Sequence, residues 1–168
     1  MIIHFAFFKA KYGGVFSKAI KLKTKGEYSH VEMIFPHYSI FDPAANRKLS
    51  LCYSSYESEG GVRFKFIYLN PEKWDIIRFE IPDEKFESLL AEAAKHSGSK
   101  YDWAGIFKFV MPWVKEKPTR FFCSEIQVYI IQNVLGIWED LVSYKTSPND
   151  LHRYLSQKYP DNQQILYN

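Results

Sequence analysis

The first half of the chain consists of short apolar runs separated by glycine, proline and polar turn residues. The run Val62–Ile67 (VRFKFI) alternates apolar and charged residues, which predicts a strand with one face in water. Further strands are predicted at Ile2–Phe8, at Tyr28–Phe35 with Pro36 as its stop, at Leu51–Tyr56 and at Trp74–Ile81. A short helix, Ser17–Thr24, is predicted between Gly13-Gly14 and Gly26.

The second half changes to a helical period after Pro82. Asp83 is a candidate N-cap for a helix that ends before Gly98, with apolar positions at Phe86, Leu89, Leu90, Ala93 and Ala94. The segment Cys123–Leu135 is apolar on nearly all sides, which is typical of a buried helix, and Gly136 ends it. Ser147-Pro148-Asn149-Asp150 has the sequence of a helix N-terminus, and this helix is predicted to reach about Lys158. Strands followed by helices predict an α+β fold with a mainly antiparallel sheet.

Composition narrows the function classes. The 168 residues fit a single domain, 1–168, and 46% of them are hydrophobic. The formal net charge is only +3 and the lysines are scattered, so nucleic acid is not an expected partner. Cys52 and Cys123 form neither a disulfide framework nor a zinc-ribbon spacing, and Cys52 is expected to pack in a strand. We therefore expect no metal and no other cofactor.

Targeting signals are not evident in the sequence. The N-terminal apolar stretch has no basic residues before it and no small-residue cleavage site after it, so it is predicted to be a strand and not a signal peptide. No apolar run reaches about 18 residues, so no membrane span is expected. These observations predict a cytoplasmic protein, with release by a non-classical or phage route left open.

Cys123 is the first candidate for chemistry. It stands at the start of the buried helix, where free N–H groups and a partial positive charge favour a thiolate. The same N–H groups can hold the oxyanion of a tetrahedral intermediate. The alternative is a small buried hydrophobic residue, and position alone does not decide between the two.

His30 is the candidate partner of Cys123. In a strand, His30 and Glu32 point to one face while Val31 and Met33 point to the other. A histidine oriented by a hydrogen-bonding neighbour could deprotonate the thiol. The alternative is a solvated sheet face, which the strand pattern by itself favours. A metal site from Cys123, His30 and Cys52 has no ligand spacing in its favour.

Two further segments carry a family resemblance. Gly98-Ser-Lys-Tyr-Asp-Trp-Ala-Gly105, followed by Phe122-Cys-Ser-Glu125, resembles the G-x-x-Y-x-W-x-G … C-S signature of NlpC-like cell-wall cysteine peptidases. Here the strand histidine precedes the cysteine, as in the circularly permuted branch that includes YiiX-like hydrolases and lecithin retinol acyltransferase-like enzymes. Gly60-Gly61-Val62-Arg63 also resembles YiiX-like proteins and their phage-encoded relatives. The resemblance covers residues 26–135.

The resemblance implies a papain-like fold with the cysteine at the start of a central helix that packs on the sheet. It implies Cys123 as nucleophile and His30 as base, with Tyr101, Trp103 and Ser124 at the substrate. The third member is open: family members use a polar residue on the next strand, here Ser54 or Ser55, with Glu57 just beyond. Glu32 is the rival, about 7 Å along the strand from His30. We favour Glu32 slightly, because a carboxylate stabilises an imidazolium better than a hydroxyl does.

The expected function is that of a thiol hydrolase. It would cleave an amide bond through an acyl-enzyme, and a peptide derived from the cell wall, such as a peptidoglycan stem peptide, is one candidate substrate. One alternative is an acyltransferase or a lipid- or thioester-directed enzyme, for which Phe107–Trp113 is a candidate membrane-facing segment, although an ordinary core segment is the favoured interpretation. The other is a non-enzymatic binding module. The substrate and the oligomeric state stay open.

Overall fold

A twisted sheet of seven strands organises the protein in a computed structural model, which describes residues 1–14, 17, 26–102 and 120–160. The strand order is β5-β1-β2-β3-β4-β6-β7, and every neighbouring pair is antiparallel except β6 and β7. The strands are β1 (Ile2–Lys9), β2 (Tyr28–Asp42), β3 (Arg47–Tyr56), β4 (Gly61–Tyr68), β5 (Trp74–Glu80), β6 (Lys100–Tyr101) and β7 (Arg120–Phe121). The predicted α+β class and mainly antiparallel sheet are confirmed.

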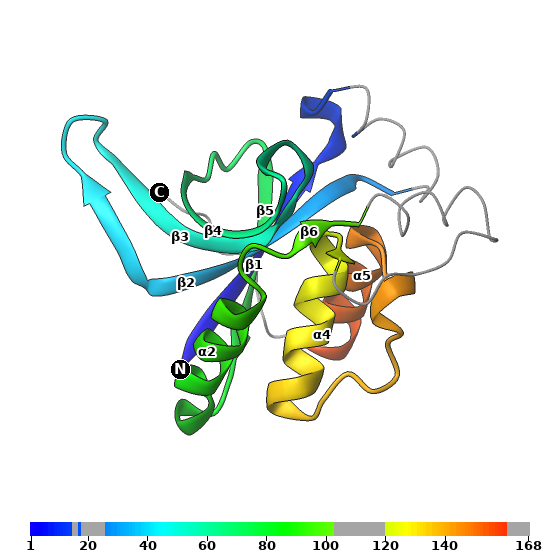
Figure 1. Ribbon diagram of the computed structural model, residues 1–168. Coiled ribbons are helices and arrows are strands. Elements are labelled where there is room, and N and C mark those ends of the chain that lie inside the picture. The colour runs from blue at the N-terminus through cyan, green and yellow to red at the C-terminus, as the bar shows by residue number, and fades with distance from the viewer. Residues whose placement is uncertain (15–16, 18–25, 103–119, 161–168) are drawn as a thin grey trace.

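Three α-helices of the described chain, α2 (Phe86–His96), α4 (Cys123–Leu135) and α5 (Pro148–Lys158), pack on one face of this sheet (Figure 1). Four 3₁₀ turns join the elements: η1 (Ala10–Tyr12), η2 (Glu57–Glu59), η3 (Asp83–Lys85) and η4 (Ser143–Lys145). The core between helices and sheet includes Phe5, Met33, Tyr53, Leu89, Ile126, Trp138 and Leu151. Burial of these large apolar side chains is the main favourable term in folding. None of the helices in the described ranges is long and apolar enough to cross a membrane.

Alternation along β2 assigns its side chains to two different surroundings. Val31 and Met33 belong to the core beneath the helices, whereas Ile34 belongs to a small cluster on the outer face. By the period of two, His30 and Glu32 point to the same outer face as Ile34. The described β2–β3 ladder ends at the pair Met33–Tyr53, close to this histidine.

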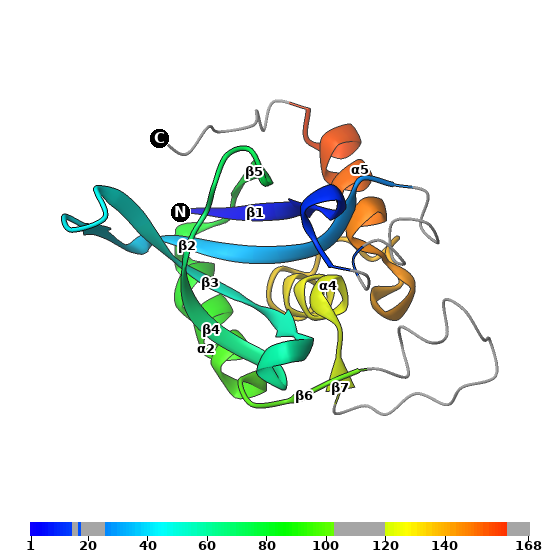
Figure 2. The ribbon, with the colours of Figure 1, turned by 90° about the horizontal axis from the view of Figure 1, so that it is seen from above.

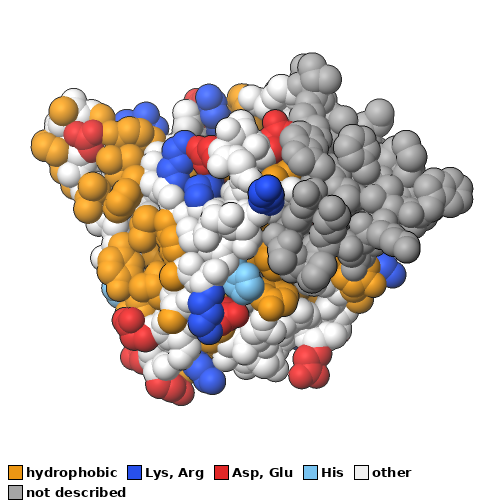
Figure 3. Space-filling view, viewed as in Figure 1, with side chains coloured by type: hydrophobic (Ala, Val, Ile, Leu, Met, Phe, Trp, Pro, Cys, Tyr) orange, Lys and Arg blue, Asp and Glu red, His pale blue; other side chains and the backbone are white. Residues whose placement is uncertain are grey.

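The hairpin of β2 and β3 projects from the body of the protein as an arm (Figures 1 and 2). The sequence predicted that Pro36 would stop the strand, and this was wrong. A bulge between Phe35 and Ile40 takes up the proline, which has no N–H to donate, and pairing then resumes. Hydrophobic side chains gather over the arm, where Phe41 is 63% exposed (Figure 3).

The helix predictions had mixed outcomes. Helix α4 has the predicted bounds, with Gly136 in the left-handed region at φ 65°, and Ser147 and Asp150 form the capping box of α5. Asp83 was wrong as an N-cap, because its carboxylate pairs with the N-terminal amine and a 3₁₀ turn precedes α2. The two-residue strands β6 and β7 were not predicted. The predicted helix Ser17–Thr24 lies outside the described residues except for Ser17.

Candidate active site

Cys123 is the first residue of α4 and is only 4% exposed. The preceding N–H, that of Phe122, donates a hydrogen bond to the Glu125 carboxylate (3.2 Å), which fixes the start of the helix. Farther along α4, the side-chain amide of Gln127 donates to the carbonyl of Tyr53 on β3 (2.8 Å). These buried bonds hold the positive end of the helix dipole at the cysteine.

His30 lies between this cysteine and a carboxylate. Its Nε2 atom is 2.7 Å from Oε1 of Glu32, and its side chain is hydrogen-bonded to Cys123. The rings of Tyr56 (4.9 Å between centroids) and Trp74 (6.2 Å) contact the imidazole edge to face and restrict its rotation.

The surroundings of His30 favour the imidazolium. Burial alone lowers the pKa of His30, but the interactions with Cys123 and then with Glu32 outweigh burial and raise this pKa to about 9. Glu32 is subject to the opposite balance. Burial raises the pKa of Glu32, whereas the hydrogen bonds and charges of His30 and Arg63 hold it below its usual range. The site therefore brings together the Cys123 thiol, a histidine that favours its protonated form and a carboxylate that stays ionised.

Arg63 on β4 holds the carboxylate from the other side. Its Nη2 donates to Oε1 of Glu32 (2.7 Å) and its Nη1 to Oε2 (2.8 Å), a bidentate pair. The sequence prediction that this face of VRFKFI would meet water was wrong for Arg63, whose side chain is 16% exposed. Gly61, the first residue of β4, lies close to the segment before β6. A Cβ on Gly61 would lie 2.0 Å from the carbonyl oxygen of Ser99, so only glycine lets the segment before β6 approach β4 this closely.

The rival third residues have other partners. Ser54 donates its hydroxyl to the carbonyl of Val31 (2.7 Å), and Ser55 donates to the carbonyl of Phe121 (2.5 Å). Both serines are fully buried and bond the backbone of adjoining segments. Glu57 lies in η2 and lines the groove described below.

Of the remaining predicted site residues, one lies beside the thiol, one bonds the backbone and one lies outside the described residues. Burial and the nearby Cys123 raise the pKa of Tyr101, so its phenol keeps its proton beside the thiol. Ser124 donates to the carbonyl of Thr146 (2.7 Å) and serves to anchor α4. Trp103 lies outside the described residues.

Cys52 is separate from this arrangement. It belongs to the small apolar cluster on the outer face, and its thiol donates to the carbonyl of Ser50 (3.4 Å). Burial raises the pKa of Cys52 well above its usual range, so this thiol is unreactive. Among the residues that the structure describes, no group of three or more His, Cys, Asp or Glu side chains could hold a metal ion.

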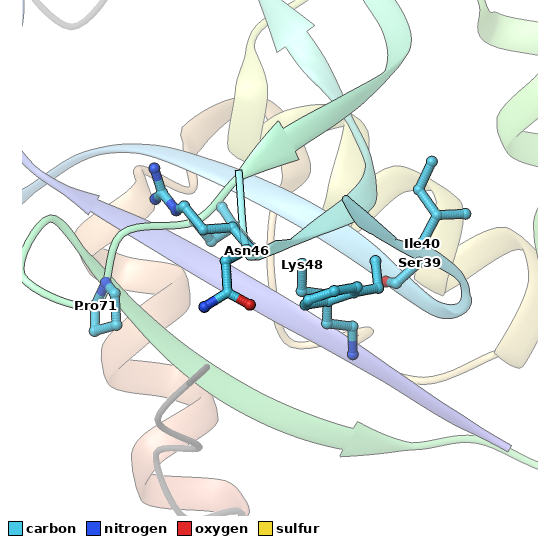
Figure 4. Close-up of a pocket in the computed structure, with 8 residues that line it drawn as sticks. Ser39, Ile40, Asn46, Lys48 and Pro71 are labelled. Atoms are coloured by element: carbon cyan, nitrogen blue, oxygen red, sulfur yellow. The ribbon is translucent and has the colours of Figure 1, made fainter. Parts of the chain in front are cut away.

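A groove of about 810 Å³ opens beside the histidine, with His30, Glu32, Tyr56, Arg63, Trp74 and Tyr101 among its lining residues. This volume is in the range of small-molecule and cofactor sites. A second hollow of about 550 Å³ lies on the arm and is lined by Ser39, Ile40, Asn46, Lys48 and Pro71, among others (Figure 4). No histidine lines this hollow. His30 and Glu32 line the groove, which makes it the candidate active site, although Cys123 is not among its lining residues.

Sequence reasoning did not identify two residues that shape this site. Arg63 lies in the Val62–Ile67 run and in the Gly60-Gly61-Val62-Arg63 segment, and no role was predicted for it. Asn149 appeared only as part of a helix N-terminus. It pairs with the backbone of Tyr28, accepting from its N–H (2.8 Å) and donating to its carbonyl (2.7 Å), two residues before His30. An asparagine in the first turn of a helix was the available sequence signal for such a role.

The comparisons with known proteins concern the fold. No protein-family model and no curated protein matches the sequence. Among solved structures, the chain is similar to the metalloprotein YiiX from Escherichia coli O157:H7, with a TM-score of 0.56 and 20% sequence identity. The match covers 98% of this chain and 84% of that chain. Together with the sheet and helices described above, it shows that this protein has a YiiX-like fold.

Proposed function

We propose that the protein is a papain-like thiol hydrolase of the permuted NlpC type, with Cys123 as nucleophile and His30 as general acid and base. One observation carries the proposal. The cysteine at the N-terminus of a buried helix interacts with a histidine whose Nε2 atom is held by a buried carboxylate. This is the arrangement of an activated nucleophile, its base and the residue that orients the base.

The proposed reaction hydrolyses an amide in two steps. The thiolate of Cys123 attacks the carbonyl carbon, and the electron pair of the C=O bond moves to oxygen, where the first-turn N–H groups of α4 stabilise it. The oxyanion collapses, the C–N bond breaks, and imidazolium His30 gives its proton to the leaving amine. Neutral His30 then takes a proton from water, whose oxygen attacks the thioester. Collapse of this second intermediate releases the carboxylic acid and restores the thiolate–imidazolium pair.

The volume of the groove is compatible with the proposed substrate class. The groove lies on the sheet face that bears His30, and its volume suits a short peptide or another small amide. A peptide derived from the cell wall remains our candidate substrate. The acyltransferase alternative depends on Phe107–Trp113, which lies outside the described residues.

A metal centre does not fit these residues, although YiiX is described as a metalloprotein. Arg63 engages both carboxylate oxygens of Glu32, and the second cysteine, Cys52, is bonded to a backbone carbonyl in an apolar cluster. The described ranges contain no group of three or more His, Cys, Asp or Glu side chains that could hold a metal ion. We therefore derive no catalytic step through a metal ion.

The test is the rate of alkylation of Cys123 by iodoacetamide at pH 6 and pH 9, followed by mass spectrometry. An ordinary thiol reacts roughly 200-fold more slowly at pH 6 than at pH 9, because its pKa is about 8.5. We expect the wild type to show a ratio below roughly tenfold, and His30→Ala to return to the ordinary ratio. Cys52→Ala is the matched control and should behave as the wild type. A wild-type thiol that is inert, or that is indifferent to His30, would overturn the proposal.

A further inference from the structure

The guanidinium of Arg63 is engaged on three of its sides. Nη1 and Nη2 bind the two oxygens of Glu32, and Nε binds the carboxylate of Glu59 in η2. Nη1 also donates to the carbonyl of Ser54 (3.3 Å). The guanidinium lies 5.7 Å from the centroid of the Tyr56 ring, the ring that also contacts His30. An arginine held in this way has little freedom to reorient, and it fixes the plane of the carboxylate that it binds.

The charges of the site alternate from the thiol outward. Cys123, His30, Glu32 and Arg63 follow one another by direct contact, and their charges sum to zero in the reactive form. Glu59 and Lys65 add a second neutral pair beyond the arginine. Because Glu32 is 1% exposed, water supplies almost no compensation for its charge. The arginine is therefore the group that lets a buried carboxylate and a buried thiolate coexist.

We propose that Arg63 is a positioning residue of the active site, which acts through Glu32 to keep the thiolate–imidazolium pair formed at mildly acidic pH. The proposal rests on the proposed function of Cys123 and His30. Without Arg63, the row of thiolate, imidazolium and carboxylate carries a net negative charge in a buried place. It then takes up a proton at higher pH, on Cys123 or on Glu32. A proton on Cys123 removes the thiolate, and a proton on Glu32 removes the anion that holds His30 charged.

The pH dependence of this pair involves the groups that face it from every neighbouring element. They are Cys52 and Tyr56 on β3, Arg63 and Lys65 on β4, Glu57 and Glu59 in η2, Tyr101 on β6 and Cys123 on α4. Burial keeps Cys52 and Tyr101 protonated. Glu59 is held ionised, because its pairing with Lys65 and Arg63 outweighs its partial burial and lowers its pKa. Near pH 6, the groups of this row that a loss of Arg63 can protonate are therefore Cys123 and Glu32.

The experiment compares alkylation of Cys123 at pH 6 and pH 9 in the wild type, Arg63→Gln, Arg63→Lys and Arg78→Gln. We expect Arg63→Gln to slow alkylation roughly tenfold or more at pH 6 and little at pH 9. The reason is that an opposite charge within about 4–6 Å shifts the pKa of a group by roughly one unit or more. Arg63→Lys keeps the charge and should recover most of the rate at pH 6. Arg78 pairs with Glu80 on the far strand β5, so Arg78→Gln is the matched control and should match the wild type.

Two further measurements separate this role from a merely structural one. If Arg63 acts through Glu32, then adding Arg63→Gln to Glu32→Gln should slow alkylation at pH 6 no further. The proposal for Arg63 would be overturned if Arg63→Gln slowed alkylation in the Glu32→Gln protein as much as in the wild type, or if Arg63→Gln alone had no effect on the rate. In either case, a reactive wild-type thiol would leave the hydrolase proposal intact. An ordinary pH ratio in the wild type would instead remove both. Should Arg63→Gln fail to fold, Arg63→Met and Arg63→Lys carry the same comparison, with only Arg63→Met expected to slow alkylation at pH 6.

Discussion

The Nε2 atom of His30 lies 2.7 Å from Oε1 of Glu32, a residue two positions along the same strand. The two Cα positions of such a pair are about 7 Å apart, and their side chains share one face of the sheet. The glutamate is long enough to close this gap. Histidine and carboxylate thus belong to one backbone element, so their separation does not depend on how two strands are aligned.

Removing the charge of Glu32 should affect both stability and reactivity. Glu32→Gln leaves the buried guanidinium of Arg63 without one of its two anions, and breaking such a pair costs about 3–5 kcal/mol. We expect the free energy of unfolding in urea to fall by an amount in this range, and alkylation at pH 6 to slow with it. Glu32→Gln combined with Arg63→Gln should regain part of the loss. A double variant as unstable as the sum of its parts would contradict the pairing.

The two buried serines should matter for stability and leave the thiol unchanged. Ser54→Ala and Ser55→Ala each remove a hydrogen bond to a buried carbonyl, from Val31 and Phe121 respectively. We expect each to lower the free energy of unfolding by about 1–2 kcal/mol. The ratio of alkylation rates at pH 6 and pH 9 should stay at the wild-type value. If Ser54→Ala or Ser55→Ala returned that ratio to the ordinary one, the serine and not Glu32 would be the third residue.

The sequence was sufficient to predict those elements whose bounds depend on residues close together in the chain. The bounds of α4 and the capping box of α5 could be predicted because each depends on residues within one or two turns. The arm could not, since Pro36 stops a strand in general and the bulge that accommodates it depends on pairing with β3. The strands β6 and β7 have two residues each, too few to show a period.

The candidate site was likewise predicted only in part. The period of two brings His30 and Glu32 to one face, and a helix start identifies Cys123 as a candidate. The alternation in VRFKFI indicates only that Arg63 and Lys65 share a face. Arg63 reaches Glu32, 31 residues earlier in the chain, across β3. Lys65 is 52% exposed, as the pattern predicts, whereas Arg63 is largely buried because its partner charge comes from another strand, which no spacing within one segment reports.

Stability should depend on pH through His30. Its pKa is about 9 in the folded protein against an ordinary value of 6.5, so the folded state holds the proton more tightly. This contribution, roughly 3 kcal/mol, is fully present below about pH 6.5 and is lost as the pH rises through 9. Urea unfolding at pH 7 and pH 10 should show a larger loss in the wild type than in His30→Gln. Equal losses would show that His30 is not held as the imidazolium.

His4 should act in the opposite direction on the acid side. Burial, followed by the charges of Lys48 and Arg78, lowers the pKa of His4 from 6.5 to about 4. The folded state therefore disfavours the proton, and stability should decline as the pH falls from about 6.5 towards 4. His4→Gln should flatten this part of the curve in urea unfolding at pH 7 and pH 5. A variant whose stability falls as steeply as that of the wild type would exclude His4 as the cause.

Asn149 should hold the start of β2, and with it His30. Its side-chain amide accepts from the N–H of Tyr28 and donates to the same residue's carbonyl, as a neighbouring strand would. A Cβ on Gly26 would lie 2.1 Å from the side chain of Asn149, so this packing is close. Asn149→Ala leaves two buried backbone groups without these partners, and we expect a loss of about 2–4 kcal/mol in urea unfolding. Asn149→Asp keeps the acceptor and loses the donor, so the free energy of unfolding should fall by less than in Asn149→Ala. An unpaired carboxylate at this position would add to the loss, and repeating the measurement near pH 4 would identify that contribution. Because Tyr28 is two residues from His30, Asn149→Ala should also slow alkylation of Cys123 at pH 6. An Asn149→Ala protein within 0.5 kcal/mol of the wild type, the range of ordinary surface substitutions, would show that α5 does not position this strand.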